Sequence, residues 1–198
     1  APSRITNLAE GLRDRDQEVE VLTCMPNYPK GRIFENYRKK FSMCEKLNGI
    51  KVHRYWTYAT TSRNVFLRLF SMFSFAVAVW FFALKVRMIK KYDRIIIQSP
   101  PILVAYSAMI LFKCLYRRTT ILNVSDLWPA SAVELGAVKE GSIFYKVLLY
   151  IEKFLYRKAN AVMGQSSVIL QHVLSLCLLR YYFALYQEDE RKGILTKQ

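Results

Sequence analysis

The sequence is poor in acidic residues and in the residue types that build metal sites and disulfide frameworks. It holds 15 Asp and Glu against 30 Lys and Arg, with only four cysteines and two histidines. No two cysteines form a CxxC pair, so neither a zinc site nor a disulfide framework is expected, and scattered thiols are typical of the cytoplasm. A start methionine and a signal-peptide pattern are also lacking, so we expect the chain to begin inside a longer sequence.

The excess of basic residues gives a formal charge of +15 and predicts a polyanionic partner. Nucleic acid, an anionic membrane and a phosphate-bearing substrate all satisfy that condition. The basic residues are dispersed in pairs and triplets, and no helix-turn-helix, zinc-finger or RNP pattern is present. We therefore expect no nucleic acid as partner.

Strands and helices are predicted to alternate along the chain. The predicted strands cover 18–23, 50–56, 93–98, 119–124 and 159–163; the predicted helices cover 3–15, 64–91, 101–116, 130–135, 142–158 and 166–180, and a long loop covers 25–48. This alternation predicts an α/β fold with a Rossmann-like parallel sheet and helices on both faces. A hydrophobic content of 53% is sufficient for a large core.

The predicted helix at 64–91 is unusually apolar. Residues 69–84 carry no charge and span about 24 Å, which is short of the roughly 30 Å of a bilayer core. The basic residues on its flanks suit a helix in the headgroup plane: Arg63, Arg68, Lys85, Arg87, Lys90 and Lys91. A buried core helix, an interfacial helix and a spanning helix remain open alternatives.

Three short polar motifs follow predicted strands. They are MPNYP at 25–29, SPP at 99–101 and SDLWP at 125–129. Because parallel strands bring their carboxyl ends to one edge of a sheet, we expect Asn27, Ser99 and Asp126 to converge on one rim.

Asp126 is the candidate catalytic residue. Its carboxylate suits the orientation of an acceptor hydroxyl or the stabilisation of developing oxocarbenium-like charge. The alternative is a cap for the helix that follows Pro129. Trp128 would add an aromatic face on which a sugar stacks.

Other candidate substrate-binding residues each have a structural alternative. Asn27 and Tyr28 would bond a sugar or a diphosphate, or would only shape a turn. Ser99 would face the cleft, although capping of the next helix is favoured over that role. Arg32 and Arg38 would meet phosphate or remain solvated.

Two further groups are expected to be structural. Glu152 and Arg157 suit a helix-surface pair or a packing bridge. His53 alternates with apolar neighbours on a strand.

Taken in order, the motifs resemble the N-terminal domain of family 4 glycosyltransferases. The matching segments are MPNYPKGRIF at 25–34, NGIKV at 48–52, RYW at 54–56, QSPP at 98–101, DLWPASAVELG at 126–136 and IEKFLYRKA at 151–159. The chain is most similar to bacterial enzymes of surface-polysaccharide assembly, of the L-fucosamine or N-acetylhexosamine transferase kind. The likeness extends from about residue 5 to residue 166 and fades in the polar tail at 187–198.

This resemblance implies one half of a GT-B fold. Residues 1–166 would form the acceptor-binding domain, and 167–198 a helix with a divergent tail. The implied acceptor is a polyprenyl-diphosphate-linked sugar at the anionic inner-membrane surface, as in O-antigen or capsule assembly, which implies a cytoplasmic protein peripheral to that membrane. A nucleotide-sugar donor would bind a second domain, and the family needs neither metal nor another cofactor.

The chain departs from the family pattern at both ends. A first hydrophobic strand with a Gly-rich loop is missing before residue 1, and its loss would leave two unpaired strand edges. The donor-binding domain is also missing, so we expect the chain to be inactive alone. The alternative function is a non-catalytic basic membrane-surface protein.

Overall fold

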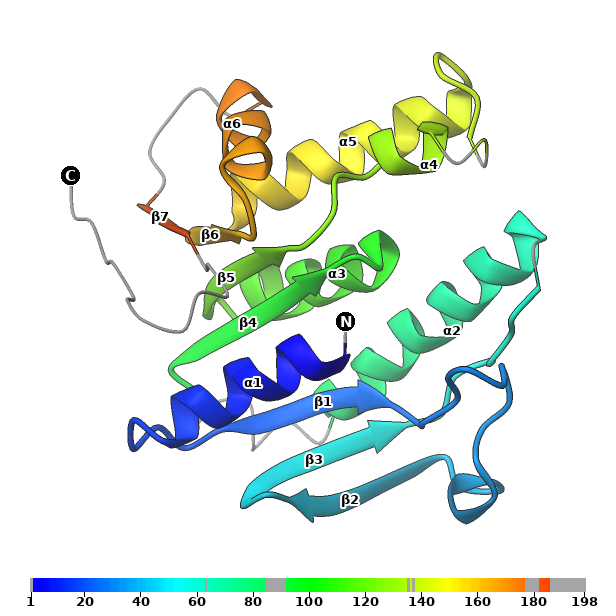
Figure 1. Cartoon of the computed structure of the whole chain (residues 1–198), viewed down its shortest axis with the longest axis vertical. Helices are drawn as coiled ribbons and strands as arrows, with labels where there is room; N and C mark the ends of the chain where they lie inside the picture. The colour runs from blue at the N-terminus through cyan, green and yellow to red at the C-terminus, as the bar shows by residue number, and fades with distance from the viewer. Residues whose placement is uncertain are drawn as a thin grey trace. The chain divides into compact units, whose positions relative to one another are not determined.

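The computed structural model describes residues 2–62, 64–84, 92–134, 136, 138–176 and 182–185. The chain divides into two compact units, Ala1–Val79 and Trp80–Gln198, and each is described by itself. Figure 1 shows parallel strands with flanking helices, which confirms the predicted α/β class. The domain boundary predicted at residue 166 stays a prediction.

The first unit holds a small mixed sheet. Its elements are α1 (Pro2–Arg13), β1 (Glu20–Cys24), the short 3-10 helix η1 (Glu35–Tyr37), β2 (Ser42–Leu47), β3 (Ile50–Tyr55) and most of α2 (Val65–Leu84). The strand order is β1-β3-β2, with β1 parallel and β2 antiparallel to β3. Residues 85–91, the predicted end of the apolar helix, lie outside the described residues.

Strand β2 corrects the prediction of a continuous loop over 25–48. It pairs with β3 through a two-residue turn in which Asn48 and Gly49 have φ of 48° and 82°. Positive φ at both positions is the geometry of a type I′ hairpin turn, for which Asn-Gly is the preferred sequence. The dipeptide was therefore a usable hairpin signal, although 42–47 shows little hydrophobic alternation.

The second unit holds a parallel sheet of order β4-β5-β6-β7. Its elements are β4 (Arg94–Ser99), α3 (Ile102–Ala108), the π-helical η3 (Met109–Leu115), β5 (Thr119–Val124), α4 (Ala130–Glu134), α5 (Ile143–Lys158), β6 (Ala161–Gly164), α6 (Ser167–Leu176) and β7 (Tyr182–Leu185). The sequence predicted a divergent tail where β7 forms, and β7 is a correction. The last residues of the helix predicted at 166–180, from 177 on, lie outside the described residues, as does residue 181.

The core of the second unit lies between the sheet and its helices. Leu122, Val124 and Val162 are fully buried on the strands, and Leu148 and Leu155 are buried on α5. Helix α5 begins where the Ser142 hydroxyl accepts from the Tyr145 amide at 3.1 Å, an N-cap bond. The amphipathic helix predicted over 142–158 is confirmed.

The described strands form two separate sheets, whereas the sequence predicted one sheet. β1 is an edge strand of the first sheet, and β4 is an edge strand of the second. Each thus has one strand neighbour among the described residues, and the predicted loss of a first strand stays a prediction.

Candidate functional site

A wide, solvent-open depression of 430 Å³, called the cavity below, lies in the first unit just past the end of β3. Its walls come from the loop that follows β1 and from the segment that follows β3: Gly31, Arg32, Ile33, Arg38, Trp56, Thr57, Tyr58 and Ala59. We call residues 25–41 the basic loop. The cavity therefore lies at the carboxyl ends of the parallel strands, where α/β sheets bind ligands.

Backbone hydrogen bonds hold both ends of the basic loop to the end of β3. The Met25 amide donates to the Tyr55 carbonyl at 2.9 Å, and the Trp56 amide donates to the Phe41 carbonyl at 2.8 Å. The Phe34 amide also donates to the Pro26 carbonyl at 3.0 Å. The loop is thus a fixed wall of the cavity.

Gly31 is the one wall position that admits no side chain. Its φ is +62°, and an added Cβ would lie 2.5 Å from Thr61 Cγ2 and 2.7 Å from the Thr61 amide nitrogen. The Gly31 amide donates to the Asn27 carbonyl at 2.8 Å, which closes a tight turn. The turn brings Arg32 to the cavity wall.

The basic loop carries a large positive charge. It holds one acidic residue, Glu35, and five basic residues: Lys30, Arg32, Arg38, Lys39 and Lys40. Arg38 Nη1 lies 3.6 Å from Glu35 Oε1, and Arg38 Nε donates to the Ile33 carbonyl at 3.1 Å. Arg32 is exposed and has no ion pair among the described residues. Its guanidinium is therefore available to an anion in the cavity.

Trp56 adds an aromatic wall, since it is 40% exposed. An indole face beside guanidinium groups suits a ligand that combines a sugar ring with a phosphate. Trp56 belongs to the RYW segment of the family likeness and was not among the predicted site residues.

Asn27 and Tyr28 are in the same loop but do not line the cavity. Asn27 Nδ2 donates to the Met25 carbonyl at 2.8 Å, which is the turn-forming alternative. Tyr28 is 81% exposed. Their predicted contact with substrate stays a prediction.

A second cavity, of 520 Å³, lies at the opposite end of the same sheet. Its wall includes three basic and three acidic side chains: Arg13, Lys46, Lys51, Glu18, Glu20 and Glu45. Beside it His53 Nε2 lies 2.7 Å from Glu20 Oε2, which supports the structural role predicted for His53. With its charges balanced, this cavity has no evident preference for an anion.

In the second unit, Ser99 and Asp126 reach the same edge of the sheet, where β4 and β5 end. The Ser125 amide donates to the Ser99 carbonyl at 2.9 Å. Asn27 belongs to the first unit, so the convergence of all three motifs stays a prediction. Ser99 is buried and does not cap α3, whose N-cap is Pro101 without a side-chain bond, so that favoured alternative is wrong.

Polar side chains at this edge satisfy one another. Gln98 Nε2 donates to Ser125 Oγ at 2.9 Å, and Asn123 Nδ2 donates to Gln98 Oε1 at 2.7 Å. The network ties β4 to β5 and leaves few polar atoms for a ligand.

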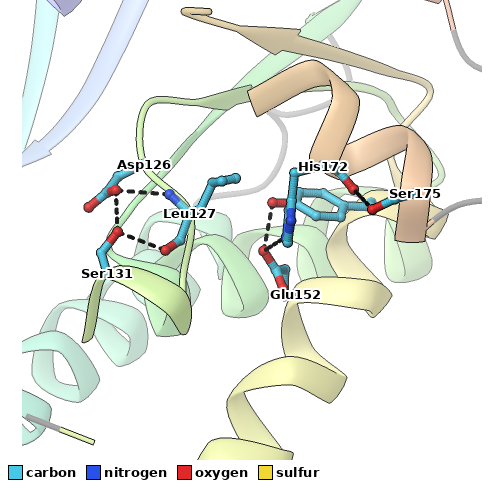
Figure 2. Close-up of polar contacts among 7 residues, drawn as sticks. Asp126, Leu127, Ser131, Glu152, His172 and Ser175 are labelled. Carbon is cyan, nitrogen blue, oxygen red and sulfur yellow. Dashed lines mark hydrogen bonds and ion pairs between the residues drawn. The ribbon is translucent and has the colours of Figure 1, made fainter. Parts of the chain in front are cut away.

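Asp126 is exposed and forms a cap-like turn (Figure 2). Its Oδ1 accepts from the Leu127 amide at 2.9 Å and from the Ser131 hydroxyl. Neither donor is a backbone amide of α4, so the capping alternative is not shown, and the role of Asp126 stays a prediction. Trp128 is half-buried, and Ser131 lies in α4.

Glu152 forms a buried bridge between α5 and α6 (Figure 2). Its Oε1 accepts from the Tyr156 hydroxyl at 2.9 Å and lies 3.2 Å from His172 Nε2, while Oε2 is buried without a partner. Burial raises the pKa of Glu152, and the Tyr156 and His172 contacts offset part of that rise. Of the two roles predicted for Glu152, the packing bridge is present, and its partner is His172, not Arg157.

A cluster of potential metal ligands is absent from the part of the chain that the structure describes. No cluster of three or more His, Cys, Asp or Glu there could hold a metal ion. Cys24, Cys44 and Cys114 are free thiols, and burial raises the pKa of Cys24. Cys177 lies outside the described residues.

Comparison with protein families gives a match over residues 1–177 to the family described as Glycosyl transferase 4-like domain. Comparison with curated proteins gives no match. Among solved structures, the FeoB G-domain from Methanococcus jannaschii is similar over 80% of this chain and 96% of that chain, with 16% identity and a TM-score of 0.26. That score is too low to carry any argument about fold or function.

Proposed function

Because the chain belongs to the family of glycosyl transferase 4-like domains, we propose that it is the acceptor-binding half of a glycosyltransferase. The reaction moves a sugar from a nucleotide-sugar donor to a lipid-linked saccharide, as in O-antigen or capsule assembly. The observation that carries the proposal is the 430 Å³ cavity lined by Arg32, Arg38 and Trp56. Those groups match a phosphate next to a sugar ring.

Within this proposal each wall group has a distinct task. The guanidinium groups of Arg32 and Arg38 bind the diphosphate of a polyprenyl-linked acceptor through charge-assisted hydrogen bonds. The indole of Trp56 packs on the apolar face of the attached sugar. Tyr28 and Asn27 extend this surface along the loop.

The second unit contributes the proposed chemistry. The exposed carboxylate oxygen of Asp126 orients the acceptor hydroxyl or stabilises positive charge that develops on the transferred sugar. Trp128 is the further proposed substrate contact, whereas Ser99 is buried and would only support the end of β4. The donor sugar binds a partner domain, and no metal or further cofactor is required.

The 198 residues alone are proposed to bind acceptor without transferring sugar. Transfer requires both substrates in one reactive geometry, and the donor site is assigned to a separate domain. The proposed location is the cytoplasmic face of an anionic inner membrane.

The proposal is tested by binding of a water-soluble, short-chain prenyl-diphosphate N-acetylhexosamine, measured by calorimetry. The double variant Arg32→Gln/Arg38→Gln should lower affinity at least about 100-fold, since each hydrogen bond to a charged group contributes about 1.5–3 kcal/mol. Arg157→Gln/Lys158→Gln on exposed positions of α5 removes the same charge elsewhere and should leave affinity unchanged. Equal losses in both variants would refute a phosphate site in the cavity.

A second candidate is a non-catalytic membrane-surface protein. It is favoured by the exposed apolar side chains of α2, among them Phe66 and Phe73. The two candidates differ in the calorimetric test, because a surface protein binds anionic vesicles but not the soluble acceptor.

A further inference from the structure

Helix α2 carries a line of exposed apolar side chains that we call the apolar stripe: Phe66, Phe70, Phe73 and Val77. Their spacing of four, three and four residues places them within about 60° of the helix circumference. The exposed fractions of the three phenylalanines are 81%, 53% and 59%. A continuous aromatic strip of this kind on a protein surface marks an interaction site.

The opposite side of α2 is held against the protein. Ala76, Ala78 and Val79 are buried, and Ser74 Oγ accepts from the Tyr58 amide at 2.9 Å. Thr57 Oγ1 also lies 3.2 Å from Ser74 Oγ. These contacts hold the middle of α2 to Thr57 and Tyr58, in the segment that follows β3.

These contacts favour one of the orientations left open by the sequence. Among the described helices, α2 alone is long and apolar enough to cross a membrane, yet only 22% of its most apolar 18-residue window is buried. A helix whose middle is hydrogen-bonded to a polar segment of a folded unit does not cross a bilayer without drawing that segment into lipid. A helix in the plane of the surface exposes one face to lipid and keeps the other on the protein.

The apolar stripe is continuous with the cavity. Tyr58 lines the cavity, and its ring lies edge-on to the Phe70 ring with centroids 5.1 Å apart. The cationic wall and the apolar stripe therefore lie on neighbouring surfaces of the same unit.

The basic loop has the composition of a segment at headgroup level. It combines its five basic residues with the exposed aromatic side chains of Tyr28, Phe34 and Phe41. Lys and Arg near an anionic leaflet each contribute about 1 kcal/mol, and aromatic rings gather at the same depth.

We infer that the apolar stripe and the basic loop form one docking surface, which seats the first unit in the plane of an anionic phospholipid bilayer. The stripe enters the acyl boundary and the cavity opens among the headgroups, where a lipid-linked diphosphate reaches it without leaving the membrane. The inference deepens the proposed function and rests on it for the ligand of the cavity, not for the membrane contact.

The test is flotation of the purified chain with vesicles of phosphatidylcholine, alone or with phosphatidylglycerol. Partitioning should be at least about tenfold stronger on the anionic vesicles and should weaken with salt. The variant Phe66→Ser/Phe70→Ser/Phe73→Ser should partition at least about tenfold less, because it removes three apolar side chains from lipid. Circular dichroism checks that the variant is folded.

A matched control removes three exposed apolar side chains from another helix. Ile143→Ser/Val147→Ser/Tyr150→Ser changes an exposed row on α5 with the same spacing of four and three residues. This control should float as the unmodified chain does. Absence of flotation by the unmodified chain, or equal effects of both triple variants, would overturn the inference.

Depth is measured with a tryptophan reporter. The added fluorescence of Phe73→Trp should be quenched more by lipids brominated near the headgroup than by lipids brominated near the chain end, as for a helix buried about 5–10 Å. Equal or stronger quenching from the chain end would indicate a spanning helix and contradict the in-plane orientation.

Two more measurements separate the remaining outcomes. Sedimentation tests whether a second copy of the chain covers the stripe. Such a dimer would dissociate in the triple Phe variant, and a dimer without flotation would overturn the membrane assignment.

The triple Phe variant should still bind the soluble acceptor of the calorimetric test. Flotation without acceptor binding in the unmodified chain would refute the proposed function and leave the docking surface intact.

Discussion

At the end of β3 in the first unit, Arg32 and Trp56 line an open cavity of 430 Å³. Near the ends of β4 and β5 in the second unit, by contrast, Gln98 and Asn123 are hydrogen-bonded to each other at 2.7 Å. Both edges are carboxyl ends of parallel strands, the usual ligand-binding position in α/β proteins. Only the first leaves strong donors exposed to a cavity. The comparison indicates that position in the sheet is not sufficient for binding, because polar groups already paired within the protein have little left to offer a ligand.

If the comparison holds, changes to the paired polar groups of the second unit should lower stability and spare acceptor binding, while changes at the cavity should affect binding. Each of the following predictions tests one side of it by urea unfolding together with calorimetric titration of the soluble acceptor.

The largest loss of stability is expected from Glu152→Ala. The change leaves the buried Tyr156 hydroxyl without its acceptor, opens a void and frees His172, so the free energy of unfolding should fall by about 2–4 kcal/mol. Acceptor affinity should not change. Glu134→Ala, at an exposed position of α4, should stay within about 0.5 kcal/mol, and a similar cost for both would remove the special role of the bridge.

Gly31→Ala should cost about 2 kcal/mol, because the residue has φ of +62° and the new Cβ meets Thr61. Since Gly31 is part of the cavity wall, acceptor affinity should also fall. The control is Gly11→Ala on α1, where an added Cβ meets nothing within 4 Å and should stabilise by about 0.5–1 kcal/mol. An unchanged affinity in Gly31→Ala would weaken the link between the turn and the cavity.

Asn123→Ala should cost about 1 kcal/mol by removing the bond to Gln98 Oε1 and should leave acceptor affinity unchanged. Asn36→Ala, at an exposed position in the basic loop, should change stability by less than about 0.5 kcal/mol. Loss of acceptor affinity in Asn123→Ala would show that the second edge takes part in binding, and would break the comparison.

The smallest effect is a change in pH dependence. Burial raises the pKa of Glu152 above its ordinary 4.5, so the folded chain binds this proton more tightly than the unfolded chain does. The stabilisation is complete below pH 4.5 and is lost as pH rises through the raised pKa. Relative to Glu152→Gln, which cannot titrate, the unmodified chain should therefore lose stability as pH increases, as measured by urea unfolding across that range. Parallel pH curves for the two proteins would show that the carboxyl does not titrate differently on folding.

Much of the fold was readable from the chain because the signals were local. Apolar strands at 93–98 and 119–124 and the amphipathic helix at 142–158 follow from hydrophobic periodicity, which depends only on neighbouring residues. β2 was missed because its residues show little alternation, and its pairing rests on the turn at Asn48 and Gly49. β7 was missed because it is only four residues long, although Tyr182 and Phe183 are residue types that favour strands.

The candidate site was predictable only in part. Motif position indicated Arg32, Ser99 and Asp126, and the structure places Arg32 on a cavity wall. Motif position did not reveal that Ser99 is buried or that Asp126 Oδ1 is occupied by the turn. Trp56 was overlooked as a site residue because it follows a strand without a polar motif of its own.

The order of residues alone determined the strand and helix segments, the basic charge and the apolar character of α2, since each depends on side-chain chemistry along a short window. Only the folded arrangement decided which face of α2 is left uncovered, which donors remain unpaired and where a cavity forms. Those properties depend on contacts between residues distant in sequence, such as Tyr58 with Phe70 and Glu152 with His172, and no local pattern encodes them.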